Sequence, residues 1–200
     1  MEIRTVAVIG AGTMGAGIAQ VCAQSGWKTN LFDAFPDGLE RGMKNIDSFW
    51  DKGIARGKTT KEQKEKWLTN LFPVSELSEA VKDADMVIEA VPEIMELKCE
   101  IFKSLGFLTK QDCILGTNTS SLSISKIAEA SGKPEKVIGM HFFNPVPIMK
   151  LLELIKHDSC SSETIDSATA AGEIMGKTTI LVNDVPGFAT SRLGVVLGNE

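Results

Sequence analysis

Residues 6–19 read Val6-Ala7-Val8-Ile9-Gly10-Ala11-Gly12-Thr13-Met14-Gly15-Ala16-Gly17-Ile18-Ala19, an apolar run, a glycine turn and a second run of small and apolar residues. The glycines at 10, 12 and 15 fit the pattern G-x-G-x-x-G, in which a strand turns into a helix against a dinucleotide. The first glycine allows the tight turn, the second a close approach of backbone to pyrophosphate, and the third close contact between helix and strand. The start of the helix then presents free N–H groups to the phosphates. The predicted cofactor contacts in this stretch are Gly10, Ala11, Gly12, Thr13, Met14 and Gly15.

The choice of dinucleotide is predicted by Asp33. This acid ends a second apolar run, Lys28–Phe32, and lies 23 residues after Gly10. An acid about 20 residues beyond the glycine turn binds the ribose 2′-hydroxyl of NAD and repels the 2′-phosphate of NADP. NAD is therefore the expected cofactor. The alternative is an ordinary strand–helix–strand unit that happens to carry an acid at a strand end.

Composition excludes several classes of protein. The chain has 200 residues, 43% of them hydrophobic and 24% charged, with a net charge of −5, which argues against a nucleic-acid partner. The sequence contains no apolar run of about 18 residues, so no membrane span is predicted. The first strand begins too early to leave room for a signal peptide. The scattered cysteines predict neither a metal site nor a disulfide framework. We therefore expect a cytoplasmic protein whose four thiols are free and buried; they are Cys22, Cys99, Cys113 and Cys160.

Strand and helix patterns alternate along the chain and predict an α/β fold, a doubly wound and mostly parallel sheet. Strands are predicted at 4–9, 27–33, 86–91, 113–117, 137–140, 150–155 and 178–182, and helices at 13–25, 94–107, 123–130 and 162–175. A helical hairpin is inserted after the second strand, with helices at 37–56 and from Thr60, a candidate N-cap, to Leu68. Its lysines and arginines form either a solvated face or a grip on a phosphorylated substrate. The predicted domains are 1–185 and the start of a second, helical unit at 186–200.

Two histidines are candidates for acid–base chemistry, which suits a side chain whose pKa is ordinarily about 6.5. His141 ends a predicted strand, at the edge where ligands bind in open α/β sheets. His157 lies in a polar stretch and is expected to be solvated. A histidine base needs an orienting partner on its other nitrogen. Glu153 is the candidate, because an acid within the apolar run Leu151–Ile155 is costly to bury unpaired. Alternatively, that strand lies at the edge of the sheet and Glu153 faces water.

Four segments together resemble the L-3-hydroxyacyl-CoA dehydrogenase family, and its bacterial 3-hydroxybutyryl-CoA dehydrogenases most of all. They are Gly10–Gly15, Asn118–Leu122, His141–Pro145 and Pro186–Phe188. The resemblance covers essentially the whole chain. It implies a Rossmann-type domain that oxidises (S)-3-hydroxyacyl-CoA to 3-ketoacyl-CoA with NAD, reversibly, in fatty-acid or butyrate-type metabolism.

The resemblance also implies roles for individual residues. His141 is then the general base, Glu153 its electrostatic partner, and Ser120 the residue that holds the reacting oxygen of the substrate. The implied cofactor contacts outside the glycine turn are Asp33, Glu93, Lys98, Ser120 and Asn144. The implied substrate contacts are Ser120, Arg56 and Ser191, the last of which replaces an asparagine that is usual in the family.

Members of the family continue beyond the end of this chain with a helical domain that forms a homodimer and covers the active site. We therefore expect these 200 residues to fold and bind NAD(H) but to turn over poorly alone. Two other functions fit the same motifs. A dehydrogenase of a non-CoA hydroxy acid would act on free acids instead of thioesters. A non-catalytic dinucleotide-binding module would bind NADH tightly without turnover.

Overall fold

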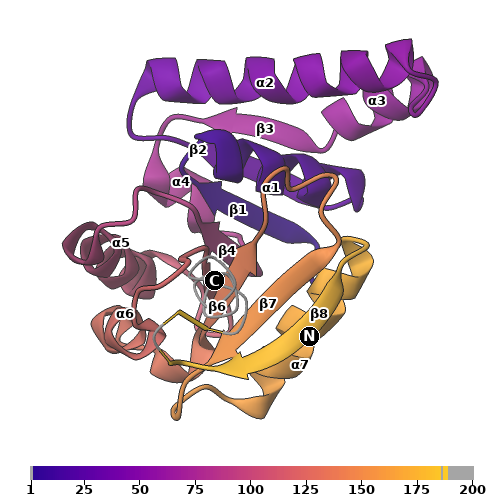
Figure 1. Ribbon diagram of the computed structural model, residues 1–200. Helices are drawn as coiled ribbons and strands as arrows, with labels where there is room; N and C mark the ends of the chain where they lie inside the picture. The colour runs from indigo at the N-terminus through magenta and orange to yellow at the C-terminus, as the bar shows by residue number, and fades with distance from the viewer. Residues whose placement is uncertain (1, 186, 189–200) are drawn as a thin grey trace, which may run out of the picture.

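The computed structural model describes residues 2–185 and 187–188, and within them a single eight-stranded sheet forms the centre of the molecule (Figure 1). The strand order is β3-β2-β1-β4-β5-β6-β7-β8. Strands β1 to β6 are mutually parallel, β7 runs antiparallel to β6, and β8 is parallel to β7. The strands are β1 (Thr5–Ile9), β2 (Lys28–Phe32), β3 (Leu71–Val74), β4 (Met86–Glu89), β5 (Ile114–Thr117), β6 (Val137–Phe142), β7 (Leu151–Lys156) and β8 (Thr178–Asn183). The predicted doubly wound, mostly parallel sheet is confirmed.

Helices cover both faces of this sheet (Figure 1). They are α1 (Thr13–Gln24), α2 (Pro36–Ala55), α3 (Lys61–Leu68), α4 (Leu77–Val81), α5 (Met95–Leu108), α6 (Ile124–Ser131) and α7 (Ser162–Ile174), with a short 3₁₀ helix at Pro134–Lys136. Two elements were not predicted, β3 and α4. Both are short, and β3 is an edge strand with a proline in its centre, so its sequence lacks the alternation expected of a half-buried strand.

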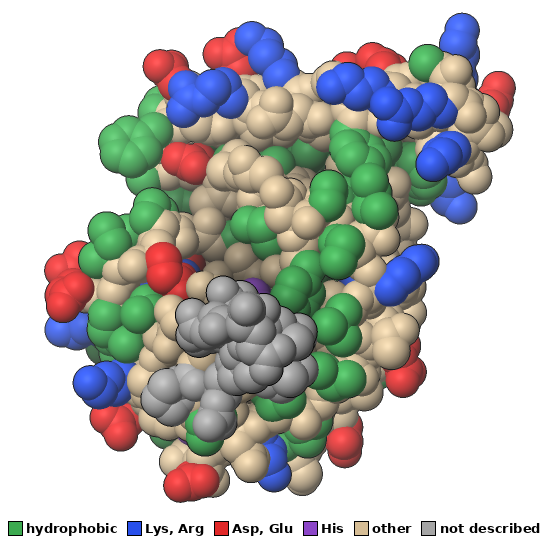
Figure 2. Space-filling view, in the orientation of Figure 1, with side chains coloured by type: hydrophobic (Ala, Val, Ile, Leu, Met, Phe, Trp, Pro, Cys, Tyr) green, Lys and Arg blue, Asp and Glu red, His purple; other side chains and the backbone are tan. Residues whose placement is uncertain are grey.

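The predicted helical hairpin is confirmed as α2 and α3, which project together from one end of the sheet. Thr60 caps α3 in a reciprocal pair with Gln63: the Gln63 amide donates to the Thr60 hydroxyl (3.2 Å) and the Thr60 amide to Gln63 Oε1 (2.9 Å). Figure 2 shows Lys and Arg side chains along this hairpin. Part of that basic face is structural, because Lys64 is bonded to both Asp47 and Asp51 at 2.6 Å.

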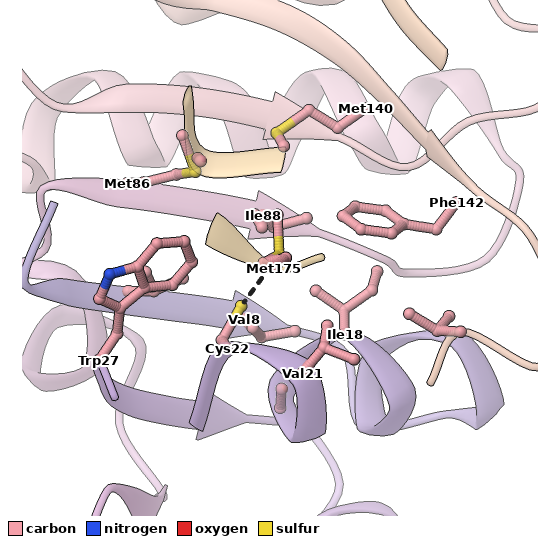
Figure 3. Close-up of a cluster of buried hydrophobic side chains, with 14 of the residues drawn as sticks. Val8, Ile18, Val21, Cys22, Trp27, Met86, Ile88, Met140, Phe142 and Met175 are labelled. Atoms are coloured by element: carbon pink, nitrogen blue, oxygen red, sulfur yellow. Dashed lines mark hydrogen bonds between the residues drawn. The ribbon is translucent and has the colours of Figure 1, made fainter. Parts of the chain in front are cut away.

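The core consists of two apolar clusters, one on each face of the sheet, because successive side chains of a strand point to opposite sides. In β1, Val6 and Val8 belong to the cluster under α1, α2 and α7, whereas Ala7 and Ile9 belong to the cluster under α4, α5 and α6. Figure 3 shows the first cluster, in which Cys22 of α1 contacts Met175 (Sγ to Sδ, 3.9 Å). The glycine turn joins β1 to α1, and both elements contribute side chains to this cluster. Their packing therefore fixes the position of the turn.

The cysteine prediction holds in part. All four thiols are free, and Cys22 and Cys113 are buried, which raises the pKa of each to about 12. Cys99 and Cys160 are only partly buried, so the prediction was wrong for them. Burial still raises the pKa of Cys160 to about 11.

His157 also differs from its prediction. Its side chain is 7% exposed, and Nε2 lies 3.1 Å from the carbonyl oxygen of Val137. The polar sequence around it indicated a solvated residue. However, β7 runs antiparallel to β6, so the residue just after β7 meets the first residue of β6 and is covered there.

The predicted second unit, 186–200, lies outside the described residues apart from Gly187 and Phe188. Phe188 itself is buried. Among the described residues, none of the helices combines the length and apolar character needed to cross a membrane.

Asp184 ties the end of β8 to the start of α6. Its carboxylate accepts hydrogen bonds from the Ser125 amide (2.8 Å) and hydroxyl (2.6 Å), the Ile124 amide (3.1 Å) and the Ser123 hydroxyl (3.3 Å). Burial works to raise the pKa of Asp184, but these hydrogen bonds outweigh it and lower the pKa overall. A lowered pKa in the folded state means that the carboxylate stabilises the fold at pH values above about 3.9, the unfolded value. This contribution is lost as the pH falls through the folded pKa.

We therefore predict that Asp184→Asn lowers the free energy of unfolding at neutral pH by about 1–2 kcal/mol, since the site is half-exposed and partly screened. The loss should shrink at acidic pH, where the wild-type carboxyl is protonated too. Urea unfolding at several pH values measures it. Asp166→Asn, which removes the same charge from an exposed position of α7, is the control. An equal loss in both variants, or one that grows in acid, contradicts the prediction.

Candidate active site

The carboxyl ends of β1, β4, β5 and β6 lie at the same end of the sheet, and β7 begins there. A pocket of about 350 Å³ opens at this end of the sheet, and Figure 2 shows the hollow with a histidine inside it. Its lining comes from α1, from the end of β6 and from the segments that follow β4, β5 and β6: Met14, Ala90, Val91, Glu93, Asn118, Ser120, His141, Phe142, Phe143 and Asn144. Four of the predicted site residues outside the glycine turn, Glu93, Ser120, His141 and Asn144, therefore share one cavity.

Each glycine of the turn has the local environment that the fingerprint requires. Gly10 has φ +97°, a conformation that favours glycine, and a Cβ there would lie 2.8 Å from the carbonyl oxygen of Ala90. At Gly15 a Cβ would lie 1.7 Å from the carbonyl oxygen of Gly10, so helix and strand are in direct contact. Above Gly12, by contrast, no described atom lies within 4 Å of a Cβ. The N-cap of α1 is Gly12, which has no side chain to cap the helix. The open space and the uncapped helix start fit the pyrophosphate of a dinucleotide.

Asp33 lies beside this turn. One carboxylate oxygen accepts a hydrogen bond from the Ala11 amide (2.7 Å) and the other from the Phe35 amide (2.9 Å). These two bonds hold the acid at the end of β2, next to the glycine turn on the adjacent strand. A fixed anion at this place suits two ribose hydroxyls and disfavours a phosphate.

His141 and Glu153 form a buried pair. They are directly opposite each other in the register of β6 and β7, so their side chains project from the same face of the sheet. His141 Nδ1 lies 2.7 Å from Glu153 Oε2, and Glu153 is 0% exposed. The alternative that Glu153 faces water at an edge is wrong, because β8 continues the sheet beyond β7. A carboxylate accepts hydrogen bonds, so Nδ1 carries the imidazole proton and donates it to Glu153. Nε2 is then the nitrogen that can accept a proton from a substrate.

Aromatic rings enclose the histidine. The ring centroids of Phe143 and Phe188 lie 4.5 Å and 6.2 Å from that of His141. The end of β6 is fixed as well, because the amide of Phe142 donates to Asn118 Oδ1 (2.9 Å). The His141 side chain is 11% exposed, so the imidazole lines the pocket but is largely shielded from water.

Glu93 holds Ser120 from behind. Its Oε1 accepts hydrogen bonds from the Ser120 amide (2.9 Å) and hydroxyl (3.2 Å), and from the Thr119 hydroxyl (2.5 Å). Burial works to raise the pKa of Glu93, but the bonds from Thr119 and Ser120 outweigh it and hold the pKa below its usual value. Glu93 is therefore an anion at neutral pH, and the loop after β5 is anchored to it.

Lys98 lies further inside than its implied cofactor role suggests. Its side chain is 0% exposed, and its ammonium lies 2.6 Å from Glu89 Oε1 and 3.6 Å from Glu93 Oε2. Glu89, also 0% exposed, accepts in addition from the Thr117 hydroxyl (2.7 Å) and the Val91 amide (2.7 Å). The ammonium and the carboxylate are thus paired with each other and hydrogen-bonded to their surroundings, so neither is buried without a partner.

One implied substrate contact, Arg56, is placed apart from this pocket, and a second, Ser191, is not among the described residues. Arg56 is the exposed C-cap residue of α2, at the far end of the hairpin, and is not part of the pocket lining. Glu89 was missed from the sequence, although it carries the signal that identified Glu153, an acid within an apolar strand.

Comparisons with known proteins agree with this geometry. Residues 5–185 match the family described as "3-hydroxyacyl-CoA dehydrogenase, NAD binding domain". The chain is 42% identical over 200 residues to a "Probable 3-hydroxybutyryl-CoA dehydrogenase" of Bacillus subtilis, covering 100% of this chain and 69% of the relative. It is 40% identical to a 3-hydroxybutyryl-CoA dehydrogenase of Clostridioides difficile, covering 98% of this chain and 69% of that one. The crystal structure of an (S)-3-hydroxybutyryl-CoA dehydrogenase from Ralstonia eutropha superposes with a TM-score of 0.94 at 36% identity, covering 99% of this chain and 72% of that one.

The fold and the site thus define an NAD-binding domain of an oxidoreductase. The chain belongs to the 3-hydroxyacyl-CoA dehydrogenase family.

Proposed function

We propose that the protein containing this chain oxidises (S)-3-hydroxyacyl-CoA to 3-ketoacyl-CoA, reversibly and with NAD. The glycine turn and Asp33 would hold NAD⁺, which would supply the hydride acceptor for C3 of the substrate, while the hydroxyl proton would pass to a base of this chain. The observation that carries the proposal is the buried pair of His141 and Glu153, whose imidazole lines a pocket that also includes Met14 of the glycine turn. An alcohol needs a base at the moment of hydride loss, and this pair supplies one.

His141 Nε2 accepts the hydroxyl proton in this scheme, because Nδ1 is already engaged by Glu153. The imidazole becomes a cation as it does so, and the buried carboxylate of Glu153 stabilises that cation. In the reverse direction the same imidazolium returns the proton to the keto oxygen. Acid–base assistance of this kind typically contributes about 10²–10⁴-fold to the rate.

The remaining site residues complete the proposal. Ser120, fixed by Glu93, holds the reacting oxygen, and Asn144 lies with it on the nicotinamide side. Glu93 is proposed to contact the cofactor. The ammonium of Lys98 is buried, so Lys98 is proposed to contribute to cofactor binding through its ion pair with Glu93. Arg56 is proposed to contact coenzyme A, and Ser191 is proposed as a further substrate contact.

The whole protein is proposed to be a cytoplasmic homodimer acting on acyl-CoA. The curated relatives above extend beyond the matched region, since the chain spans 69% of their length. In this proposal the further segment forms the dimer and closes the acyl site. The free thiols support a reducing compartment.

An assay with acetoacetyl-CoA tests the function. We expect NADH oxidation with acetoacetyl-CoA, with much lower efficiency for NADPH, because Asp33 would oppose its 2′-phosphate. Both this chain and an extended chain, joined to the further segment of the Bacillus subtilis relative, should be measured. The extended chain should be the faster, since closure over the substrate excludes water.

Free acetoacetate serves as the control substrate. Activity on the free acid without activity on the thioester would support a non-CoA hydroxy-acid dehydrogenase instead. Tight NADH binding with no turnover in the extended chain would support a non-catalytic module. Equal efficiency with NADPH would contradict the role of Asp33.

A further inference from the structure

Lys177 is a buried lysine outside the site described above. Its side chain reaches the loop between β6 and β7, where its ammonium donates hydrogen bonds to the carbonyl oxygens of Val146 (2.5 Å) and Met149 (2.9 Å). The residue is 8% exposed, and no carboxylate of the described residues lies within ion-pair distance of it. Burying a cation costs free energy, and here only hydrogen bonds to backbone carbonyls offset that cost. Burial and the neighbouring Lys150 lower its pKa accordingly.

The end of α7 aims this side chain at the loop. Gly176 follows the helix with φ +70°, a conformation that favours glycine, and turns the chain back toward the sheet. Lys177 then precedes β8, which pairs in parallel with β7, so the starts of the two strands are neighbours (Figure 1). The amide of Thr178 donates to the carbonyl oxygen of Lys150 (2.7 Å), which secures this junction. The ammonium therefore bonds the loop directly, and Lys177 is not among the residues that line the pocket of His141.

The loop that Lys177 holds also carries Asn144. Val146 fits tightly against α1, since a Cβ on Gly17 would lie 2.9 Å from Val146 Cβ. Within the loop, the amides of Ile148 and Met149 both donate to the carbonyl oxygen of Pro145 (2.9 Å each). Asn144 itself is exposed and lines the pocket of His141 and Ser120. Its position therefore depends on how firmly the residues after it are clamped to α1.

We propose that Lys177 is the positioning residue of this loop, which we call the Asn144 loop (residues 143–150). By bonding the carbonyls of Val146 and Met149, it holds Asn144 where the nicotinamide half of the cofactor binds. The inference rests on the proposed role of this side of the pocket. It assigns a function in cofactor binding to a residue that touches neither cofactor nor substrate.

The test compares Lys177→Met with Lys133→Met. Lys133 is a matched control, because its ammonium also bonds two carbonyl oxygens, those of Thr109 (3.0 Å) and Lys110 (3.1 Å). These two residues precede β5 and therefore lie at the opposite end of the sheet from the pocket. We expect Lys177→Met to weaken NADH binding about tenfold, the range expected for a lost charged hydrogen bond. ADP-ribose, which lacks the nicotinamide, should bind unchanged. Hydrogen exchange of the Ile148 and Met149 amides should accelerate about tenfold.

Lys177→Arg, which keeps the cation, should restore most of the NADH affinity. Lys133→Met should lower stability without changing either affinity. If Lys177→Met behaves like Lys133→Met, the proposal is overturned; equal losses for NADH and ADP-ribose overturn it too. Should Lys177→Met fail to fold, Lys177→Gln, which keeps a donor, replaces it in the same comparison. None of these readouts needs turnover, so they are independent of the proposed reaction. Wild-type NADH affinity in Asn144→Ala would also overturn the proposal, because the expected effect of Lys177 on the cofactor is exerted through Asn144.

Discussion

Replacing His141 with glutamine in the extended chain is expected to lower turnover by about 10²–10⁴-fold while leaving NADH binding nearly intact. Glutamine has no nitrogen that can accept a proton at neutral pH, whereas the glycine turn and Asp33 are untouched. Steady-state rates with acetoacetyl-CoA measure the first effect, and fluorescence titration with NADH the second. Glu153→Gln should also lower turnover, because a neutral partner stabilises the imidazolium less.

His157→Gln is the matched control for this experiment. His157 is the other histidine and is equally buried, but it bonds a backbone carbonyl at the opposite end of β6. Its replacement should affect stability and spare the rate. If His141→Gln retains most of the activity, the base is another residue and the proposed chemistry fails.

The second large effect is expected at Gly12. Gly12→Ala should leave the free energy of unfolding nearly unchanged, since the new Cβ meets no described atom within 4 Å and the backbone there has φ −66°. NADH affinity should nevertheless fall by about tenfold or more, because the methyl group occupies the space through which the pyrophosphate approaches. Calorimetric titration and urea unfolding measure the two quantities on the same samples.

Gly15→Ala provides the contrast. Its Cβ would lie 1.7 Å from the carbonyl oxygen of Gly10, so the strand–helix junction itself must move. We expect a loss of about 3 kcal/mol or more in the free energy of unfolding. Undiminished NADH affinity in Gly12→Ala would show that the open space is not used by the cofactor.

Local patterns predicted the parts of the site that are close together in sequence. The glycine turn and Asp33 follow from a spacing rule that reflects one strand–helix–strand unit. The pair His141 and Glu153 came from a strand end and from an acid in an apolar run, and the short connection between β6 and β7 brought the two together.

Contacts between distant segments could not be predicted in this way. The anchoring of Ser120 by Glu93 joins loops that follow two different strands, and Lys177 reaches the Asn144 loop from 28 residues beyond Met149. The burial of His157 depends on the direction of β7, which no local pattern reveals. Each of these needs the strand order and direction, and residue periodicity contains neither.

The reversal of strand direction at β7 has a consequence for how this protein tolerates change. Side chains alternate between the two faces of a strand, so shifting β7 by one residue against β6 would move Glu153 to the opposite face. A single-residue insertion or deletion in the Asn144 loop threatens such a shift and would separate the acid from the imidazole while every residue of the site was still present. The turn between α2 and α3 is a different case, because it joins two helices and does not directly connect two paired strands. The length of one short loop is therefore as much a part of the proposed catalytic site as the residues on either side of it.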